Sequence, residues 1–192
     1  MSDADASPAE LFTIGAVTAA AASGSSVTFA VDVSPGTLAG INTALDAGVI
    51  YDPGATPPQT DMVTLTVADA FGATDAVNFI FNVADPPAST PIALASTSER
   101  DVLFGTGYED QFVFGVSSNR DTIIDFTAGT DHIDLSALSA IVDSANINSF
   151  LANNVTSLGG HDTLITLDSN DTITLRNVAF SSLHAGDFIV HA

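Results

Sequence analysis

The chain has 192 residues, 46% of them hydrophobic, which is enough for one large or two small domains with a buried core. Its formal net charge is −20, and such a surface repels phosphate, which argues against nucleic acid as a partner. The sequence contains no cysteine and no apolar run of about 18 residues, which argues against disulfides, thiolate metal sites and a membrane span.

The acidic residues are mostly aspartates, with twenty Asp against three Glu and no lysine. One interpretation is a solvated acidic surface suited to salty water. The other is cation binding, because short carboxylates fit tight loops around a hard cation such as calcium. The sequence favours the second interpretation without excluding the first.

The first part of the chain shows the alternation of apolar residues that is typical of β-strands. The pattern runs through residues 25–33, through 61–70 and through 76–83, and a Gly-containing and Asp-containing turn around Gly72 predicts a hairpin between the last two. Leu38, Ile41 and Leu45 are spaced for a short helix that ends at Gly48. Several short strands in this length predict a β-sandwich.

This region resembles the cadherin-like and immunoglobulin-like repeats of very large bacterial adhesins. The resemblance rests on "INTALDAGVIYDP" and on "TDMVTLTVADAFGATDAVNFIFNV", and it covers roughly residues 27 to 84. It implies an immunoglobulin-like or cadherin-like β-sandwich over residues 1–88.

A break in composition follows, because three prolines lie in the segment "DPPASTP" at residues 85–91. We expect a linker at residues 89–96 and a second domain at residues 97–192.

The second domain begins with "GTGYED", in which Gly105, Gly107, Asp110 and Phe112 occupy positions of the calcium-binding nonapeptide G-G-x-G-x-D-x-U-x. Glycines allow a sharp turn whose carbonyl groups point inward, and the aspartate adds charge. One such loop supplies only part of the six to eight oxygens that calcium needs, so a neighbouring turn must supply the rest. Taken alone, this degenerate copy is a weak signal.

The segments that follow are more specific. "DTIIDFTAGTDHIDLS" at residues 121–136 and "DTLITLDSNDTITLRNVAFSSLHAGDFIV" near the end resemble the C-terminal module of serralysin-type proteases and of other RTX proteins exported by type I secretion. The resemblance covers about residues 97 to 192. It implies a short calcium-binding parallel β-roll that ends in a type I secretion signal.

The resemblance also implies a set of calcium ligands, namely the carboxylates of Asp110, Asp121 and Asp131 with carbonyl groups near Gly105 and Gly107. Gly129 turns the chain between the strands, and we expect this turn to bring Asp121 and Asp131 within reach of one cation.

Two further aspartates, Asp125 and Asp134, are either additional ligands or turn residues that accept backbone N–H groups. Beyond them, the apolar spacing in residues 136–157 predicts one or two short helices packed on the roll.

No enzymatic motif is present. The four histidines form no H-E-x-x-H zinc site, and the chain has neither a G-x-S-x-G elbow nor a phosphate-binding loop. We therefore expect a non-enzymatic region.

The sequence as a whole predicts a mostly β, secreted or cell-surface protein region with calcium as its cofactor. Its function would be export and structural or adhesive presentation as the C-terminal piece of an RTX adhesin, with roles in cell adhesion and biofilm. The expected partners are calcium ions, the type I exporter, and a surface glycan or further copies of the chain. The alternatives are the secretion-targeting tail of an exported hydrolase and a calcium-bridged surface-layer or matrix subunit.

Overall fold

The computed structural model describes residues 11–14, 18–20, 26–29, 36–37, 49–52, 59–68, 74–82 and 91–192. The predicted helix around Leu38–Leu45 lies outside these residues, as does most of the Pro-rich break. The first strands are β1 (Leu11–Ile14), β2 (Thr18–Ala20), β3 (Ser26–Phe29), β4 (Gly36–Thr37), β5 (Val49–Asp52), β6 (Thr60–Ala68) and β7 (Thr74–Asn82).

The predicted hairpin is confirmed, because β6 and β7 pair along their whole length with Thr64 opposite Asn78. β1 and β2 both add to β6 in antiparallel fashion, and β3 pairs with β5 in a separate sheet. The immunoglobulin-like arrangement of the first 88 residues stays a prediction.

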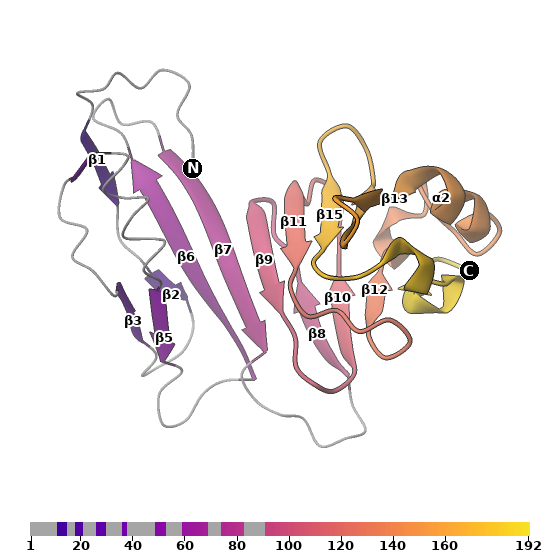
Figure 1. Ribbon diagram of the computed structural model, residues 1–192, viewed down its shortest axis with the longest axis horizontal. Helices are drawn as coiled ribbons and strands as arrows, with labels where there is room; N and C mark the ends of the chain where they lie inside the picture. Colours follow the sequence, from indigo (N-terminus) through magenta and orange to yellow (C-terminus); the bar gives the residue numbers. More distant parts are fainter. Residues whose placement is uncertain are drawn as a thin grey trace.

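The second half of the chain winds into a parallel β-roll, as predicted (Figure 1). Successive strands alternate between two sheets, one with the order β15-β11-β9-β7 and the other with the order β16-β12-β10-β8. The strands of the roll that follow β7 are β8 (Ile92–Ala95), β9 (Arg100–Phe104), β10 (Asp110–Val113), β11 (Arg120–Ile123), β12 (His132–Asp134), β15 (Thr172–Leu175) and β16 (Phe188–Ile189).

The roll begins earlier than the sequence indicates. β7 pairs in parallel with β9, and β8 pairs in parallel with β10, so β7 and β8 form the first coil. β8 lies inside residues 89–96, the range expected to be a linker. Ile92 and Leu94 explain why this segment is a strand, since both side chains are buried in the core. The division of the chain into two domains stays a prediction.

An insertion between β12 and β15 covers the end of the roll. It contains the short 3-10 helix η1 (Ser136–Leu138), the α-helix α2 (Ile147–Asn154) and the hairpin of β13 (Val155–Leu158) with β14 (Asp162–Thr166). Phe150 of α2 packs edge-on against Phe188, with ring centroids 6.4 Å apart. The predicted short helices are therefore present. Two further 3-10 turns, η2 (Phe180–Ser182) and η3 (Ala185–Asp187), precede β16.

The core of the roll lies between its two sheets. Alternate residues of each strand point inward, and burying them drives the short strands together. The most deeply buried large side chains include Leu103, Phe112, Phe114, Ile123 and Ile133, each 0% exposed. No helix in the described part of the chain is both long and apolar enough to cross a lipid bilayer.

One buried hydroxyl ties the insertion to the segment after β15. The side chain of Thr163 is 0% exposed, and its Oγ1 donates a 2.7 Å hydrogen bond to the carbonyl oxygen of Val178. We expect Thr163→Val to keep the shape but remove this donor, which should lower the free energy of unfolding by about 1–3 kcal/mol. Urea denaturation would measure the change.

The matched control is Thr156→Val on the exposed face of β13. Because Thr156 is exposed, we expect its replacement to change stability by no more than about 0.5 kcal/mol. Equal losses in the two variants would contradict the role assigned to the Thr163 hydrogen bond.

Candidate metal centre

The winding of the roll places its turns in two rows. The first turn row consists of the segments that enter the β15-β11-β9-β7 sheet, which are residues 96–99, 114–119 and 167–171. The second turn row consists of the segments that enter the β16-β12-β10-β8 sheet, which are residues 105–109, 124–131 and 176–187. Buried aspartates lie in or directly after the turns of both rows.

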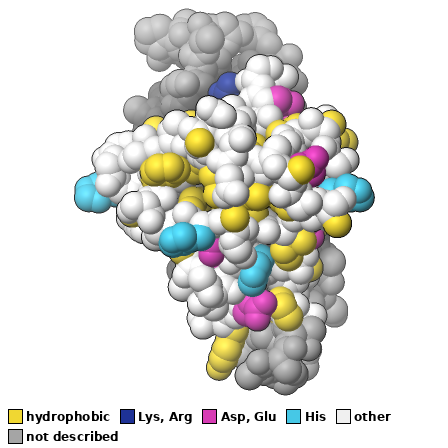
Figure 2. Space-filling view, turned by 90° about the vertical axis from the view of Figure 1, so that its right-hand side faces the viewer, with side chains coloured by type: hydrophobic (Ala, Val, Ile, Leu, Met, Phe, Trp, Pro, Cys, Tyr) yellow, Lys and Arg dark blue, Asp and Glu magenta, His cyan; other side chains and the backbone are white. Residues whose placement is uncertain are grey.

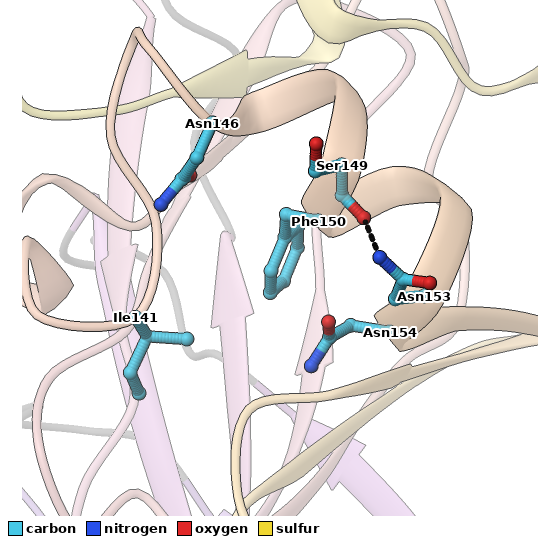
Figure 3. Close-up of a pocket in the computed structure, with 6 residues that line it drawn as sticks. All are labelled: Ile141, Asn146, Ser149, Phe150, Asn153 and Asn154. Carbon is cyan, nitrogen blue, oxygen red and sulfur yellow. Dashed lines mark hydrogen bonds between the residues drawn. The ribbon is translucent and has the colours of Figure 1, made fainter.

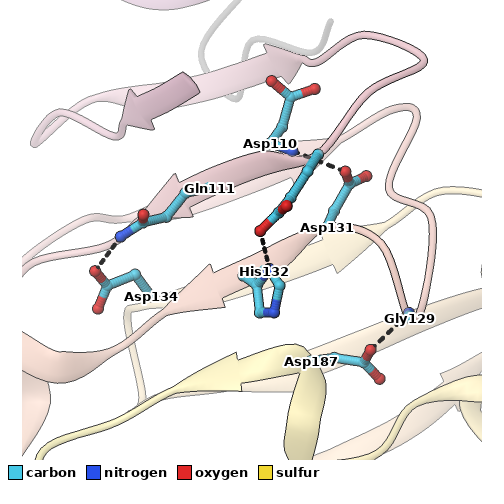
Figure 4. A network of polar contacts seen from close by, with 8 residues as sticks. Asp110, Gln111, Gly129, Asp131, His132, Asp134 and Asp187 are labelled. Carbon is cyan, nitrogen blue, oxygen red and sulfur yellow. Dashed lines mark hydrogen bonds and ion pairs between the residues drawn. The ribbon is translucent and has the colours of Figure 1, made fainter. Parts of the chain in front are cut away.

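In the second turn row, Asp110 at the start of β10 and Asp131 directly before β12 lie side by side (Figure 4). Their side chains are 0% and 1% exposed. The backbone N–H of Asp110 donates to Oδ1 of Asp131 at 3.0 Å, and the N–H of Gly105 donates to Oδ1 of Asp125 at 2.8 Å. Each carboxylate therefore holds the coil that precedes it.

Each of these aspartates also closes its own turn. Oδ2 of Asp110 accepts the N–H of Thr106 at 2.6 Å, and Oδ2 of Asp131 accepts the N–H of Thr127 at 2.7 Å. In both cases the donor lies four residues before the aspartate. A buried carboxylate must receive such donors, because burying a charge without partners is costly.

A ladder of polar side chains crosses the first turn row. Thr64 Oγ1 donates to Asn78 Oδ1 at 2.8 Å, and Asn78 Nδ2 donates to Asp101 Oδ1 at 2.9 Å. The N–H of Asp101 then donates to Oδ1 of Asp121 at 2.9 Å. The ladder thus links β6, β7, β9 and β11 and ends at Asp121.

The carboxylate of Asp121, at the end of this ladder, lacks a hydrogen bond on one oxygen in the described structure. Asp121 is 1% exposed, and within the described residues its Oδ2 has no hydrogen-bond partner. Burial raises the pKa of Asp121 to about 8, although the N–H of Asp101 opposes the rise; the neighbouring charges of Asp101 and Asp171 add to it.

Aspartates of the second turn row also have raised pKa values. Burial raises the pKa of Asp131 to about 6, against the opposing N–H groups of Thr127 and Asp110, and the charges of Asp110 and Asp125 raise it further. Burial also raises the pKa of Asp125. Among the described residues, no cationic side chain contributes to these shifts. The described ion pairs of Arg100 and Arg176 go instead to Asp75 and Asp162.

Asp134 belongs to a different environment. Its Oδ1 accepts the N–H of Ser136 at 2.8 Å and its Oδ2 accepts Nε2 of Gln111 at 2.6 Å. Burial raises the pKa of Asp134, but these hydrogen bonds outweigh burial, so the pKa lies below its ordinary value. Gly107 lies in an exposed turn with no atom within 4 Å of the position a Cβ would take.

The structure brings together some of the residues expected to bind calcium and separates others. Gly105, Asp110, Asp125 and Asp131 share the second turn row. Asp121 lies in the first, because β11 carries the chain from one row to the other before Asp131 is reached. The expectation that Asp121 and Asp131 approach one cation is therefore wrong for this arrangement.

Sequence reasoning also missed several members of the two rows. For two of them the signal is an aspartate followed two residues later by an apolar side chain that is 0% exposed, namely Asp101 with Leu103 and Asp171 with Ile173. Strand alternation turns both members of such a pair inward. The missed members are Asn78, Asn82, Asp101, Asp171 and Asp187.

The side-chain oxygens in these rows are the kind of donor that a hard cation binds, but too few of those described converge on one point. In the described part of the chain, no three acidic or histidine side chains converge closely enough to hold a metal ion. The buried atoms without partners there are nevertheless all oxygens, namely Asn82 Oδ1, Ser96 Oγ, Ser118 Oγ and Asp121 Oδ2. A calcium ion would need backbone carbonyls in addition to these side chains.

Comparison with known families identifies the chain. The family described as the C-terminal domain of peptidase M10 serralysin matches residues 59–192, so the chain belongs to this family. The match begins at the start of β6 and includes the whole roll. A comparison with curated proteins finds no significant match.

The family is the non-catalytic C-terminal part of serralysin-type proteins. It is an RTX-type module whose repeats are generally calcium-binding, and it is linked to type I secretion. Membership therefore implies an extracellular protein.

Proposed function

We propose that this chain is a non-enzymatic export and structural module whose roll is stabilised by calcium after secretion. The observation that carries the proposal is the buried carboxylate of Asp121. Within the part of the chain that the structure describes, one of its oxygens has no partner and no cationic side chain is bonded to it. Repulsion among such carboxylates opposes folding where calcium is scarce, and a bound divalent ion would supply the missing positive charge.

The residues proposed to hold calcium divide between the two rows. In the second turn row they are Asp110, Asp125 and Asp131, with carbonyl groups near Gly105 and Gly107. In the first turn row the proposed ligand is Asp121. Asp134 is a weaker candidate, because hydrogen bonds already stabilise its charged form. An ion that binds only the folded chain converts its binding energy into folding energy.

We further propose that the module presents an adhesin at the cell surface. The support is the resemblance of residues 27 to 84 to cadherin-like adhesin repeats. A second candidate, the targeting tail of an exported hydrolase, is supported by the match to a protease family's C-terminal domain. Native sequence upstream of Met1 would decide between them, since repeated sandwich units favour the adhesin and a zinc or serine motif favours the enzyme.

The calcium proposal predicts a specific gain in stability. Thermal and urea unfolding, followed by far-UV circular dichroism, should be compared in chelator and in calcium. At a calcium concentration of about 100 times Kd we expect a gain of about 2.7 kcal/mol. Magnesium should give less, because it demands a more rigid octahedral site.

Two variants sharpen this test. Asp131→Asn should reduce the gain, since it removes charge from the second turn row. Glu99→Gln, an exposed position of the first turn row that is not among the proposed ligands, should leave the gain unchanged. A roll that is equally stable in chelator and in calcium would refute the proposal.

A further inference from the structure

A small pocket lies beside α2, at the end of the roll away from β1–β6 (Figures 1 and 3). Its volume is about 190 Å³, below the range of about 300–1,000 Å³ that holds drug-sized ligands. A ligand would therefore be a single small ring or a comparable group. The pocket is lined by Ile141, Asn146, Ser149, Phe150, Asn153 and Asn154.

Internal hydrogen bonds fix the three amide groups of this lining. Asn153 Nδ2 donates to the carbonyl oxygen of Ser149 at 2.8 Å, and Asn154 Nδ2 donates to that of Thr166 at 2.9 Å. Asn146 Oδ1 accepts the N–H of Asp143 at 3.0 Å. Each amide is thus held in one orientation. In Figure 3 the free Oδ1 of Asn154 points toward Phe150, and that of Asn153 points outward.

The available ends form a mixed set of donors and acceptors. Within the described residues, no hydrogen bond engages Oδ1 of Asn153, Oδ1 of Asn154 or Nδ2 of Asn146. The hydroxyl of Ser149 can both donate and accept. A set that contains both acceptors and donors can bind hydroxyl groups, each of which also donates and accepts.

The pocket also has an apolar wall. Phe150 is 4% exposed and its ring is held in place by Phe188, while Ile141 is half-buried on the opposite side (Figure 3). Apolar side chains in such a wall can contact the C–H face of a ring whose hydroxyl groups meet the amides.

The electrostatic setting favours a neutral ligand. None of the six lining residues is charged, although the chain carries a formal charge of −20. Carboxylates are sparse on the face of the molecule that includes this end (Figure 2). The pocket therefore offers no carboxylate to bind a cation, and the net charge of the chain repels anions.

We propose that this pocket binds a neutral polyhydroxylated ligand of the size of one sugar residue. The inference goes beyond the calcium-dependent export module, because the pocket uses none of the aspartates in the two turn rows. It would also give the module a ligand of its own.

Titration of the ¹⁵N-labelled full chain with glucose, galactose and mannose would test the proposal. We expect the amide signals of residues 146–154 to shift and saturate for at least one sugar, with Kd near about 1 mM because the site is small. The titration should be run in calcium and in chelator. Unfolding that is unaffected by calcium would count against the export proposal. The absence of saturating amide shifts at residues 146–154 in calcium would count against the pocket.

The variant Ser149→Ala/Asn153→Ala should weaken binding at least about tenfold, which corresponds to about 1.4 kcal/mol. Both positions are exposed on α2 and alanine favours helix, so folding should persist. Ser149→Ala alone provides a milder second variant. Asn170→Ala, in an exposed turn elsewhere, should bind like the wild type. Shifts that do not saturate, or that persist unchanged in the double variant, would overturn the proposal, as would no shift with any sugar.

Discussion

Replacing Gly105 by alanine is expected to destabilise the roll by about 3–5 kcal/mol, because the added Cβ has no room. The Cβ would lie 2.5 Å from Oδ2 of Asp110 and 3.1 Å from Cζ of Phe112. Both neighbours are 0% exposed, so neither can move into solvent.

Moving the Asp110 carboxylate would carry a further cost. Its Oδ2 accepts hydrogen bonds from the N–H and from Oγ1 of Thr106, and its Oδ1 accepts one from Nδ2 of Asn82. Hydrogen bonds to a charged group contribute about 1.5–3 kcal/mol each, and leaving a buried carboxylate with fewer donors is costly. We therefore expect a large loss in the urea midpoint, measured by circular dichroism.

Gly107→Ala is the matched control within the same motif. No atom lies within 4 Å of the position that a Cβ would take at Gly107. Its replacement should change stability by no more than about 0.5 kcal/mol. Similar midpoints for the two variants would show that the turn around Gly105 relaxes, and that the close contact with Asp110 does not limit stability.

The two glycines illustrate how far the sequence alone can lead. The nonapeptide pattern treats Gly105 and Gly107 alike, because both match positions where glycine is typical. Only the packing of Asp110 and Phe112 against the turn distinguishes them. Both contacts lie within the same nonapeptide, but a pattern of residue types does not show which glycine they crowd.

Local patterns did predict the elements whose signals are local. The alternation of Val63 and Leu65 with polar residues predicted β6, and the spacing of Ile147, Phe150 and Leu151 predicted α2. β8 was missed because its four residues follow a Pro-rich stretch and are too short to show a period. Strand pairing with β10 is what makes this segment a strand.

The candidate site was predicted only in part, for the same reason. Asp110 and Asp131 were recognised by their motifs, but some of their hydrogen-bond partners lie far away in the sequence. Asn82 is 28 residues from Asp110, and Asp110 is 21 residues from Asp131. Such pairs follow from the register between coils, and no pattern within one coil encodes that register.

In the absence of calcium, we expect the stability of the folded chain to fall as pH rises from about 4 to about 8. The reason is that the folded state holds protons which the unfolded state has released. The pKa of Asp121 is about 8 in the folded chain against 3.8 for an ordinary aspartate, and that of Asp131 is about 6. Urea unfolding in chelator at several pH values would measure this.

The sign follows from the direction of each shift. An acid whose folded pKa is raised imposes no penalty below its unfolded pKa, and its penalty grows until pH passes the folded pKa. Each pKa unit corresponds to about 1.4 kcal/mol. Asp121 and Asp131 therefore contribute equally to the slope up to about pH 6, and Asp121 continues the decline to about pH 8. The pKa of Asp134 is lowered, which adds stability only as pH rises through the acid range below about 4.

Asp121→Asn isolates this contribution. Asparagine keeps the shape of the protonated acid and stays neutral, so the variant should lose much of the decline and exceed the wild type at about pH 8. Below about pH 4, where Asp121 is protonated in both the folded and the unfolded chain, the two proteins should differ little. Asp168→Asn is the control, because Asp168 is exposed and its pKa is lowered by the N–H groups of Asn170 and Asp171. Two results would contradict this prediction: a free energy of unfolding of the wild type that stays flat or rises over this pH range, or a decline that Asp121→Asn leaves unchanged. Either result would show that ionising the buried carboxylate of Asp121 does not destabilise the folded chain. The case for a cation there would then lose its electrostatic basis.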